Sequence, residues 1–384
     1  MDNTATAEAS QLVARVRRFV SEEVLPAASA LEHRDEYPTH LVRRMREIGL
    51  FSMTIPREYG GLGINTTTYA AVVEELCRGW MSLSGMLHSP GCTHLLTHYG
   101  TEEQKQRWLP RMATGDIIGV LALTEPNAGS DVQALQATAV RRGDFYTLNG
   151  TKQFITNSVH GGLFATLVKT DTAVRPPYRG ISCFMIEKNT PGFTVGRSLQ
   201  KLGYKGVSTC ELHFQDAQVP VKNLLGNKEG EGFLQLMSGL ELSRIHVSSR
   251  ALGEAQAALD AALQFASQRQ TFGKPIAQHQ AIQVKLADMA TRLQAARHLV
   301  LAAAAKKDRG ERCDLESGMA KLVSTEACAE IAIESVRIHG GRGYLKDYPV
   351  ERYYRDAPFM VIADGTSDVL KLVIARNLYK KYPV

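Results

Sequence analysis

FYTLNGTKQFIT, residues Phe145–Thr156, places aromatic and β-branched side chains among turn-forming Gly and Asn, which is a strand pattern. Similar short runs, broken by Gly, Asn, Asp and Pro, fill the chain from about Gly119 to about Gly226: VLALTE, LFATLVKT, ISCFMIEK, FTVGR and CELHFQDAQVP. Runs of this length and spacing are typical of an all-β module. We therefore expect a β unit in the middle of the chain.

Helical patterns lie on both sides of this β region. On the N-terminal side they are QLVARVRRFVSEEVLP, expected to stop at Pro26, then LVRRMREIGLFSM, TYAAVVEELCRGW, the stretch ending in HLLTHYG, and TEEQKQRWLPRM with Thr101 as its cap. On the C-terminal side three long amphipathic patterns follow one another from Gly232 to His339. The sequence predicts a mixed α and β fold, mainly α, with a helical domain over 1–120, a β domain over 121–230 and a helical domain over 231–384.

Composition limits the class of protein. The chain has 384 residues, 44% of them hydrophobic and 22% charged, as in soluble globular proteins. No apolar run approaches the ~20 residues of a membrane span, and no secretory signal pattern opens the chain. Six scattered cysteines indicate reduced thiols in a cytoplasmic protein. The net charge is +6, but no run of like charges dominates the sequence, so nucleic acid is disfavoured as a partner. A mild positive balance would also suit a small ligand with several phosphates.

The segment IADGTSDVLKL, Ile362–Leu372, places a carboxylate on a turn before a helical run. Asp364 is a candidate general base, because apolar surroundings raise the basicity of a carboxylate. The same residues also suit a helix cap, since Ser or Asp before a helix is favoured for hydrogen bonding alone. The local sequence by itself favours the cap.

Two motifs in the β region suit a flat or phosphorylated ligand. TEPNAGSD, Thr124–Asp131, is a loop whose hydroxyls and amides suit carbonyls or phosphates, although Pro, Asn and Gly populate ordinary turns too. FITN, Phe154–Asn157, places an aromatic ring and a hydroxyl on one face of a strand, which suits a flavin, although on these four residues alone an ordinary core edge is the simpler explanation.

Each of the remaining motifs has a simple structural explanation beside a functional one. Arg269 in SQRQTFGKPIAQHQ suits a pyrophosphate or a solvated helix end. HGGRGY follows a helix rather than a strand, so it is not a dinucleotide fingerprint, and a nicotinamide-binding Rossmann fold is disfavoured. His94 and His98 stand four residues apart without a third ligand, so we expect ordinary helix histidines and no metal site.

Taken in order, the motifs EYGGLG, ALTEPNAGSD, GTKQFITN, RQTFGKPI with LADM after it, RIHGGRGY and RDAPFMVIADGTSD resemble those of the acyl-CoA dehydrogenase family. They are spread over most of the chain. The resemblance implies an N-terminal helical domain, a central β-barrel-like domain and a C-terminal four-helix bundle. It also implies FAD as cofactor and a homotetramer built as a pair of dimers, with a homodimer as the smaller assembly.

The resemblance also assigns site residues. Thr124, Ser130, Phe154 and Thr156 match contacts to the flavin or its pyrophosphate in the same subunit, and Thr366 and Asp368 match a segment beside that cofactor. Three residues match contacts to the FAD of a neighbouring subunit: Arg269, Thr271 and Phe272. Three more match the segment near the adenosine half of FAD: Arg337, Gly340 and Gly341. Arg244 matches an arginine at the entrance of the acyl-CoA cleft.

Asp364 occupies the position where most of the family carries a glutamate that removes the proton alpha to the thioester. Aspartate is shorter by one bond, ~1.5 Å, and a displacement of ~1 Å can lower a rate about a hundredfold. A second branch of the family places its base at the position of Ser243, which is no base unaided, and Glu241 is expected to point elsewhere. Asp364 is therefore the expected base. Some relatives of this superfamily, nitroalkane oxidase among them, also use aspartate.

The expected reaction is FAD-dependent alpha,beta-dehydrogenation of an acyl thioester, carried on CoA or on an acyl-carrier protein, with an electron-transfer flavoprotein as acceptor. Two alternatives stay open: a flavin oxidase or monooxygenase acting on a substrate without CoA, and a non-catalytic flavin-binding relative. Ser82 and its neighbours offer no evident cation for a dicarboxylyl substrate.

Overall fold

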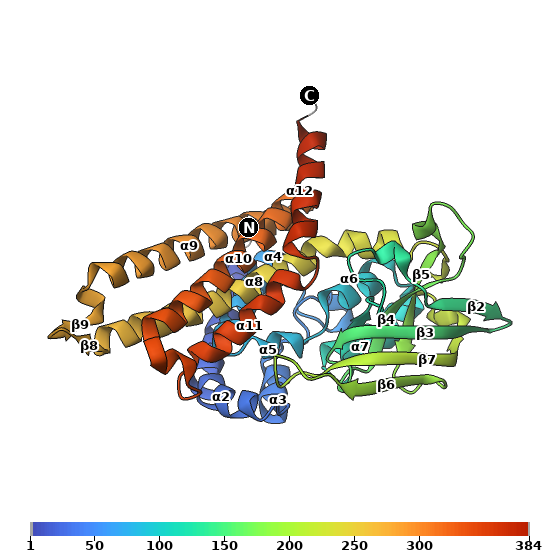
Figure 1. Ribbon diagram of the computed structural model, residues 1–384. Helices are drawn as coiled ribbons and strands as arrows, with labels where there is room; N and C mark the ends of the chain where they lie inside the picture. The colour runs from blue at the N-terminus through green and yellow to red at the C-terminus, as the bar shows by residue number, and fades with distance from the viewer. Residues whose placement is uncertain (1–2, 383–384) are drawn as a thin grey trace.

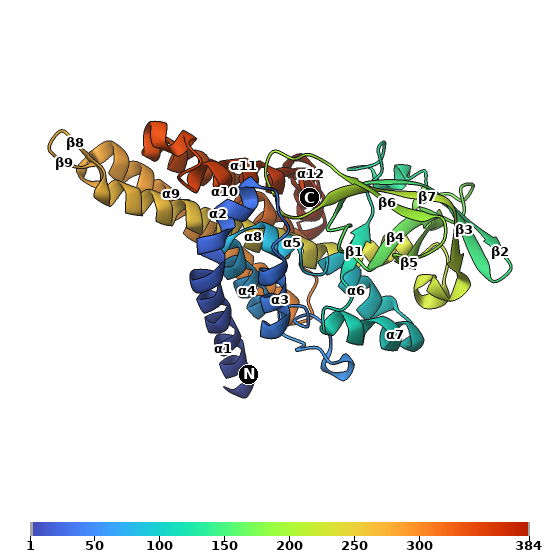
Figure 2. The same cartoon turned by 90° about the horizontal axis from the view of Figure 1, so that it is seen from below.

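The computed structural model describes residues 3–382, with side chains from residue 7 onward. It shows the expected order of helices, a sheet and helices again (Figure 1). The sheet lies at one end of the molecule, and the long C-terminal helices extend toward the other end in both views (Figures 1 and 2).

The N-terminal part is built from seven helices within the described residues, α1 to α7. Their bounds are Asn3–Phe19, Leu25–His33, Thr39–Ile48, Thr66–Gly79, Ser82–Gly85, Pro90–Tyr99 and Glu102–Ala113. Thr101 caps α7 in a capping box with Gln104, as predicted.

The predicted stop at Pro26 is wrong. A π-helical turn, Val20–Val24, joins α1 to α2, and Pro26 falls at the second position of α2. In the π-helical turn Leu25 N donates to Val20 O, five residues back, and this local change of hydrogen-bond pattern accommodates a proline, which has no amide hydrogen to donate. The helical path therefore continues to His33.

The central part is a curled sheet of seven strands, β1 to β7. They span Gly119–Ala122, Thr138–Arg142, Phe145–Thr156, Leu163–Lys169, Ile181–Glu187, Phe193–Ser198 and Thr209–Pro220. The strand order is β1-β4-β2-β3-β7-β6, and β5 pairs with β4. Apolar side chains such as Leu148, Phe164 and Leu212 fill the inside of the curl.

The C-terminal part consists of α8 Gly232–Gln268, α9 Gln280–Asp308, α10 Asp314–His339, α11 Val350–Ile362 and α12 Ser367–Lys381. A small hairpin of β8 Gln270–Thr271 and β9 Lys274–Pro275 closes the turn between α8 and α9. Helix α10 packs against α8, α9, α11 and α12, whereas the end of α12 projects away from the other helices (Figure 1).

One large hydrophobic core joins the first and last parts of the chain. Helix α4 packs along α8, and Val73 and Leu76 belong to the same core as Ala251 and Leu252. A second core lies between α6, α7 and the sheet. All six cysteines are buried free thiols. None of the described helices is long and apolar enough to cross a membrane.

Candidate active site

Asp364 lies on the short connection between α11 and α12. Its backbone is left-handed, with φ of 50°, and Gly365 follows at 93°. The carboxylate is exposed to solvent and takes part in no hydrogen bond or ion pair with the described residues. Thr366 is the residue that caps α12, since its hydroxyl accepts from Val369 N at 3.2 Å. The capping role that the sequence favoured for this turn therefore falls on Thr366, and the Asp364 side chain is left free.

A buried lysine on α10 holds this connection in place. Lys321 Nζ donates to Val361 O at 3.2 Å and to Gly365 O at 2.8 Å, on either side of Asp364. Its side chain is fully buried, and this burial lowers the pKa of Lys321 to about 8. Next to it, Ser367 Oγ donates to Glu326 Oε1 at 2.5 Å. The backbone that carries Asp364 is thus fixed from α10.

The surroundings of Asp364 act on its basicity in two directions. Protein packed around this accessible carboxylate strips much of its hydration, and that desolvation raises the pKa of Asp364 above the ordinary value of 3.8. The positive charges of Arg250, Lys321 and Arg244 oppose the rise in pKa, in that order. The result is a carboxylate more basic than a free aspartate, held among three cations.

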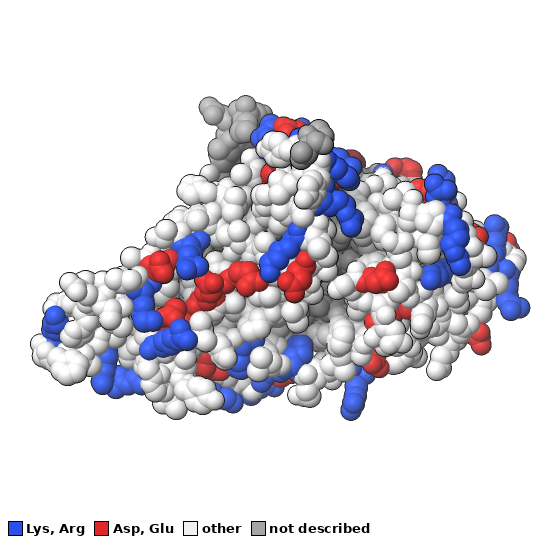
Figure 3. Space-filling view, turned by 45° about the horizontal axis from the view of Figure 1, so that its top comes forward, with Lys and Arg blue, Asp and Glu red and all other residues white. Residues whose placement is uncertain are grey.

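Arg244 lies where α8 meets the start of α10. Its Nη1 is 3.9 Å from Asp314 Oδ1, and it lines a groove of about 580 Å³ between α8, α12 and the α9–α10 connection. The groove is mostly cationic, because its other charged lining residues are Glu241, Lys307, Arg312, Asp314, Arg376 and Lys380. Figure 3 shows basic side chains along α12, beside a hollow next to the sheet.

The residues expected to contact flavin in the same subunit lie together at the sheet. Gln153 N donates to Thr124 O at 2.8 Å, which sets the TEPNAGSD loop beside β3. At Phe154 the strand bulges with φ of 59°, and the ring is 60% exposed. Thr156 is half-buried and Ser130 is exposed, while Ile155 between Phe154 and Thr156 is buried. The one-sided exposure of Phe154 and Thr156 agrees with the sequence pattern.

An ion pair that the sequence analysis missed supports this loop. Lys152, fully buried on β3, donates to Glu125 Oε1 at 2.7 Å and to Leu123 O at 3.1 Å. Glu125 in turn accepts from Gln136 N at 2.6 Å and Ala137 N at 3.1 Å. A lysine at an inward position of an alternating strand is the signal that could have indicated it.

A loop joins the sheet to the region of Asp364. Its β7 end lies beside the residues expected to contact flavin, where Asn157 N donates to Ser208 O at 2.7 Å and Thr209 pairs with Thr156. Further back, Tyr204 stacks on Phe359 of α11 with ring centroids 4.5 Å apart. The 199–208 segment therefore connects the two groups of candidate residues.

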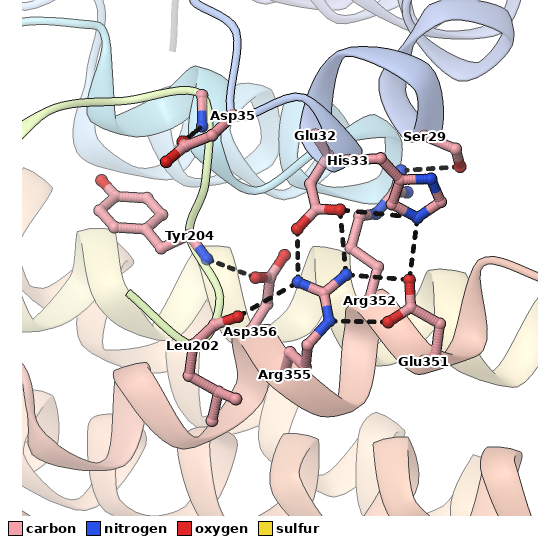
Figure 4. Close-up of polar contacts among 11 residues, drawn as sticks. Ser29, Glu32, His33, Asp35, Leu202, Tyr204, Glu351, Arg352, Arg355 and Asp356 are labelled. Atoms are coloured by element: carbon pink, nitrogen blue, oxygen red, sulfur yellow. Dashed lines mark hydrogen bonds and ion pairs between the residues drawn. The ribbon is translucent and has the colours of Figure 1, made fainter. Parts of the chain in front are cut away.

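Charged residues anchor this loop from the helices (Figure 4). Asp356 Oδ1 of α11 accepts from Tyr204 N at 2.5 Å, and Asp35 Oδ1 accepts from Gly206 N at 2.7 Å. Arg355 of α11 pairs with Glu351 at 2.7 Å and with the fully buried Glu32 of α2, to whose Oε2 it donates at 2.9 Å. These contacts tie α2, α11 and the loop together.

The remaining expected cofactor contacts lie far from the sheet. Arg269, Thr271 and Phe272 form the β8–β9 tip at the opposite end of the molecule (Figures 1 and 2), where Phe272 is 96% exposed with φ of 50°. His339 stacks on Phe265 at 4.2 Å, which brings Arg337, Gly340 and Gly341 near the same end of α8. A single chain therefore does not bring all the expected cofactor residues together.

Three family models match consecutive parts of the chain: acyl-CoA dehydrogenase N-terminal domain over residues 6–116, middle domain over 120–217 and C-terminal domain over 230–379. This chain belongs to the acyl-CoA dehydrogenase family. It is 44% identical to an acyl-CoA dehydrogenase of Bacillus subtilis over 94% of this chain and 96% of that protein. It is 41% identical to the mitochondrial short-chain specific acyl-CoA dehydrogenase of Rattus norvegicus, over 95% and 89%.

The fold is equally close to solved structures. Butyryl-CoA dehydrogenase from Megasphaera elsdenii superposes with a TM-score of 0.93 at 36% identity, covering 98% of this chain and all of that one. The chain is accordingly an FAD-dependent acyl-CoA dehydrogenase, an oxidoreductase that dehydrogenates acyl thioesters. The residues present fit FAD. The exposed ring of Phe154 lies at a strand bulge, with the Thr156 hydroxyl on the same face and the TEPNAGSD loop beside it, and this arrangement suits a planar group stacked on the ring.

Two other residues of this acyl-CoA dehydrogenase, Ser243 and Glu241, lie on α8 near the position that carries the base in a second branch of the family. Ser243, the position used by a second branch of the family, is buried on α8. Glu241 accepts from Lys307 Nζ at 2.6 Å and from Cys313 N at 2.8 Å. Both Glu241 oxygens hold the α9–α10 connection, so this carboxylate points away from the Ser243 position, as expected.

His94 and His98 are engaged in contacts within the protein. His94 Nε2 hydrogen-bonds Ser238 Oγ at 2.8 Å, and the two imidazoles stack at 4.1 Å. Among the described residues, Glu32, His33 and Glu351 are the group whose ligand atoms lie close enough for a metal. The Arg355 guanidinium already pairs with both carboxylates of that group, so a cation of the protein occupies the place of an ion.

Proposed function

We propose that Asp364 is the base that removes the alpha proton of an acyl-CoA. The observation that carries the proposal is an exposed carboxylate, free of hydrogen bonds to the described residues, whose pKa is raised by desolvation and whose backbone is fixed by Lys321. The left-handed φ of 50° is a strained conformation for a non-glycine residue, and such strain clusters at functional sites.

The reaction needs one co-reactant, an acceptor for the hydride. Asp364 takes the alpha proton as the alpha C–H bond breaks, the beta hydrogen leaves as hydride, and a carbon–carbon double bond forms. FAD, when bound, supplies the hydride acceptor. The raised pKa strengthens Asp364 as a base, because a general base works best with a pKa near the working pH. The neighbouring cations favour its ionised form and would favour the negative charge that develops on the thioester.

The groove lined by Arg244 supports CoA as the thioester carrier. Five cations, Arg244, Lys307, Arg312, Arg376 and Lys380, face it with two carboxylates, so the local balance suits the phosphates of CoA. Arg244 also contributes to the field at Asp364, which links this groove to the base. An acyl-carrier protein would present its phosphopantetheine to the same cations.

The exposed β8–β9 tip supports an assembly of several copies, in which one subunit completes the cofactor site of its neighbour. Phe272 is almost fully exposed at a strained backbone, which suits a ring that another copy covers. We place Arg269, Thr271 and Phe272 against the FAD of a neighbouring subunit, and Arg337, Gly340 and Gly341 near the adenosine half, in a homotetramer or homodimer. An electron-transfer flavoprotein takes the electrons in the cytoplasm. Analytical ultracentrifugation showing a monomer with full FAD content would contradict this assembly.

Anaerobic mixing with acyl-CoAs of different chain lengths tests the proposed reaction. We expect the flavin absorbance to bleach without oxygen, because the substrate itself supplies the hydride. No bleaching with any thioester would contradict the reaction. Substrate-dependent oxygen consumption without an added acceptor would instead indicate the flavin oxidase alternative.

A further inference from the structure

Arg250 is a buried arginine on α8 that acts on the charge of Asp364, but this role does not explain two N–H groups of its guanidinium. Only 5% of the residue is exposed. Its guanidinium carbon lies 4.7 Å from the ring centroid of Tyr204 and 5.1 Å from that of Phe359, so two stacked rings cradle it. Within residues 3–382, neither its Nε nor its Nη2 finds a hydrogen-bond acceptor.

The Tyr204 hydroxyl and the charge of Asp364 both favour the guanidinium cation. Its Nε and Nη2 are still costly to bury, because these two N–H groups have lost water and gained no acceptor. Aromatic faces attract the charge but do not accept both N–H bonds. The nearest acid along α8, one turn away, is Glu254. Burial raises the pKa of Glu254 well above its usual value, and its Oε1 is also unpartnered in the described part of the chain. Glu254 is therefore held toward its neutral form and is a poor counter-ion.

The two unpaired atoms have a specific geometry. Nε and Nη2 form the side edge of the guanidinium, which matches the two oxygens of a carboxylate in a bidentate pair. The α4–α5 turn supplies further buried polar atoms without partners among the described residues, Trp80 Nε1 and Ser82 Oγ. This turn borders Tyr204, since a Cβ on Gly85 would lie 1.6 Å from the Tyr204 hydroxyl and one on Gly206 would meet the Trp80 ring at 2.6 Å.

Among the described residues Asp356, which holds Tyr204 N, also leaves one oxygen without a partner. Burial raises the pKa of Asp356 to about 6, so this acid too is a weakened counter-ion. The N–H donors Arg250 Nε, Arg250 Nη2 and Trp80 Nε1 therefore suit a ligand that brings acceptors.

Arg250 lies within electrostatic reach of Asp364. An acyl chain whose alpha carbon meets Asp364 would therefore need only a short extension to reach the guanidinium. We propose that Arg250 binds a carboxylate at the far end of a short acyl chain, so that the preferred substrate is a dicarboxylyl thioester. This inference rests on the proposed function, because it uses Asp364 as the point where the alpha carbon lies.

Two thioesters with the same number of carbons, glutaryl-CoA and pentanoyl-CoA, test it. They differ in a terminal carboxylate against a methyl group. We expect the wild-type enzyme to have the higher kcat/KM for glutaryl-CoA. Arg250→Gln should lower the ratio of the two kcat/KM values by about a hundredfold, because a buried charge-assisted pair is lost. Arg250→Lys keeps the positive charge but loses the two parallel N–H donors of the guanidinium, so its ratio of kcat/KM values should lie between those of the wild type and Arg250→Gln. Arg141→Gln, at an exposed position on β2, is the control for loss of one positive charge and should keep the wild-type ratio.

A binding measurement separates recognition from turnover. Equilibrium dialysis can measure binding in the Asp364→Asn background, where no turnover occurs. There, adding the Arg250→Gln change should weaken the binding of glutaryl-CoA by about a hundredfold. The binding of pentanoyl-CoA should not change. FAD content and the thermal midpoint of each variant check folding. A wild-type preference for pentanoyl-CoA, or an equal loss for both thioesters in Arg250→Gln, would overturn the inference and leave the proposed function standing. If no thioester reduces the flavin, the proposed function fails and this inference fails with it.

Discussion

At the scale of single residues, the account depends on how the surroundings of Asp364 set its charge. Desolvation raises the pKa of its carboxyl, and the positive charge of Arg250 is the largest opposing influence. Proton removal needs the ionised form, so kcat/KM should rise with pH through a midpoint above the ordinary aspartate value of 3.8.

Arg250→Gln should move that midpoint to higher pH, because the cation that lowers the pKa of Asp364 is gone. The pH dependence of kcat/KM with pentanoyl-CoA, which has no terminal carboxylate to bind Arg250, checks the direction in which the midpoint moves. Arg141→Gln serves again as the control. A midpoint that moves to lower pH, or stays in place, would contradict the assignment of Asp364 as the titrating base.

The local sequence makes Asp364 a candidate, because a turn with Asp, Gly and Thr before a helix is visible there, but it favours a helix cap. The resemblance to the family is what assigns Asp364 the role of base. The residues that control Asp364 were not visible in the same way. Lys321 and Arg250 are single basic residues inside long helices, and α8 lies far from Asp364 along the chain. Only packing shows that they face one turn, since pattern reasoning treats a basic residue on a helix as solvated by default.

At the scale of elements, the α11–α12 connection depends on α10. Lys321→Met should leave Val361 O and Gly365 O without their donor and let Asp364 shift. Since a displacement of ~1 Å can lower a rate about a hundredfold, we expect kcat to fall by roughly tenfold to a hundredfold. Stability should change less, because removing a buried amine also removes its desolvation penalty.

Single-turnover flavin reduction and thermal unfolding of Lys321→Met measure the two effects separately. Lys228→Met is the matched control, because Lys228 lies exposed before α8 and pairs with Glu231 at 2.9 Å. Equal reduction rates for the wild-type and Lys321→Met enzymes would show that α10 does not position the base.

Elements were predicted best where the pattern was long. The helices α8, α9 and α10 and most strands follow the predicted runs, whereas strand β2 was not foreseen and the helix was expected to stop at Pro26. The strand β2, Thr138–Arg142, is short and has two adjacent exposed arginines, so it lacks the alternation of apolar and polar residues that indicates a strand. The π-helical turn that lets the helix pass Pro26 is a backbone adjustment with no sequence pattern of its own.

At the scale of the whole molecule, a network of charges joins parts of the chain that are distant in sequence. Arg355 pairs α11 with α2 through Glu351 and the buried Glu32 (Figure 4). Arg355→Met should leave Glu32 buried without its main partner, which destabilises a protein by about 3–5 kcal/mol. Thermal unfolding of the FAD-loaded enzyme should show a clearly lower midpoint.

Arg34→Met is the control for this network, because Arg34 is exposed and pairs with the exposed Glu36 at 2.8 Å. Exposed pairs contribute about 0–1 kcal/mol, so its midpoint should stay close to wild type. Equal midpoints for Arg355→Met and Arg34→Met would mean that the buried network does not hold the N-terminal helices to α11.

The order of domains and the family could be predicted from the sequence, because six motifs recur in family order along the chain. The boundaries 1–120, 121–230 and 231–384 stay predictions. How the separated cofactor residues meet is a matter of assembly, since the β8–β9 tip and the sheet lie at opposite ends of one chain (Figure 1). No local pattern contains that information.

Rapid anaerobic mixing of Asp364→Asn with its best acyl-CoA tests the central claim most directly. Asparagine keeps the shape of the side chain and removes the base. We predict full FAD content and a rate of flavin reduction lower by about 10³-fold, within the usual contribution of a general base. Asp288→Asn, exposed on α9, should reduce at the wild-type rate. Flavin reduction by Asp364→Asn at the wild-type rate would show that another group removes the proton.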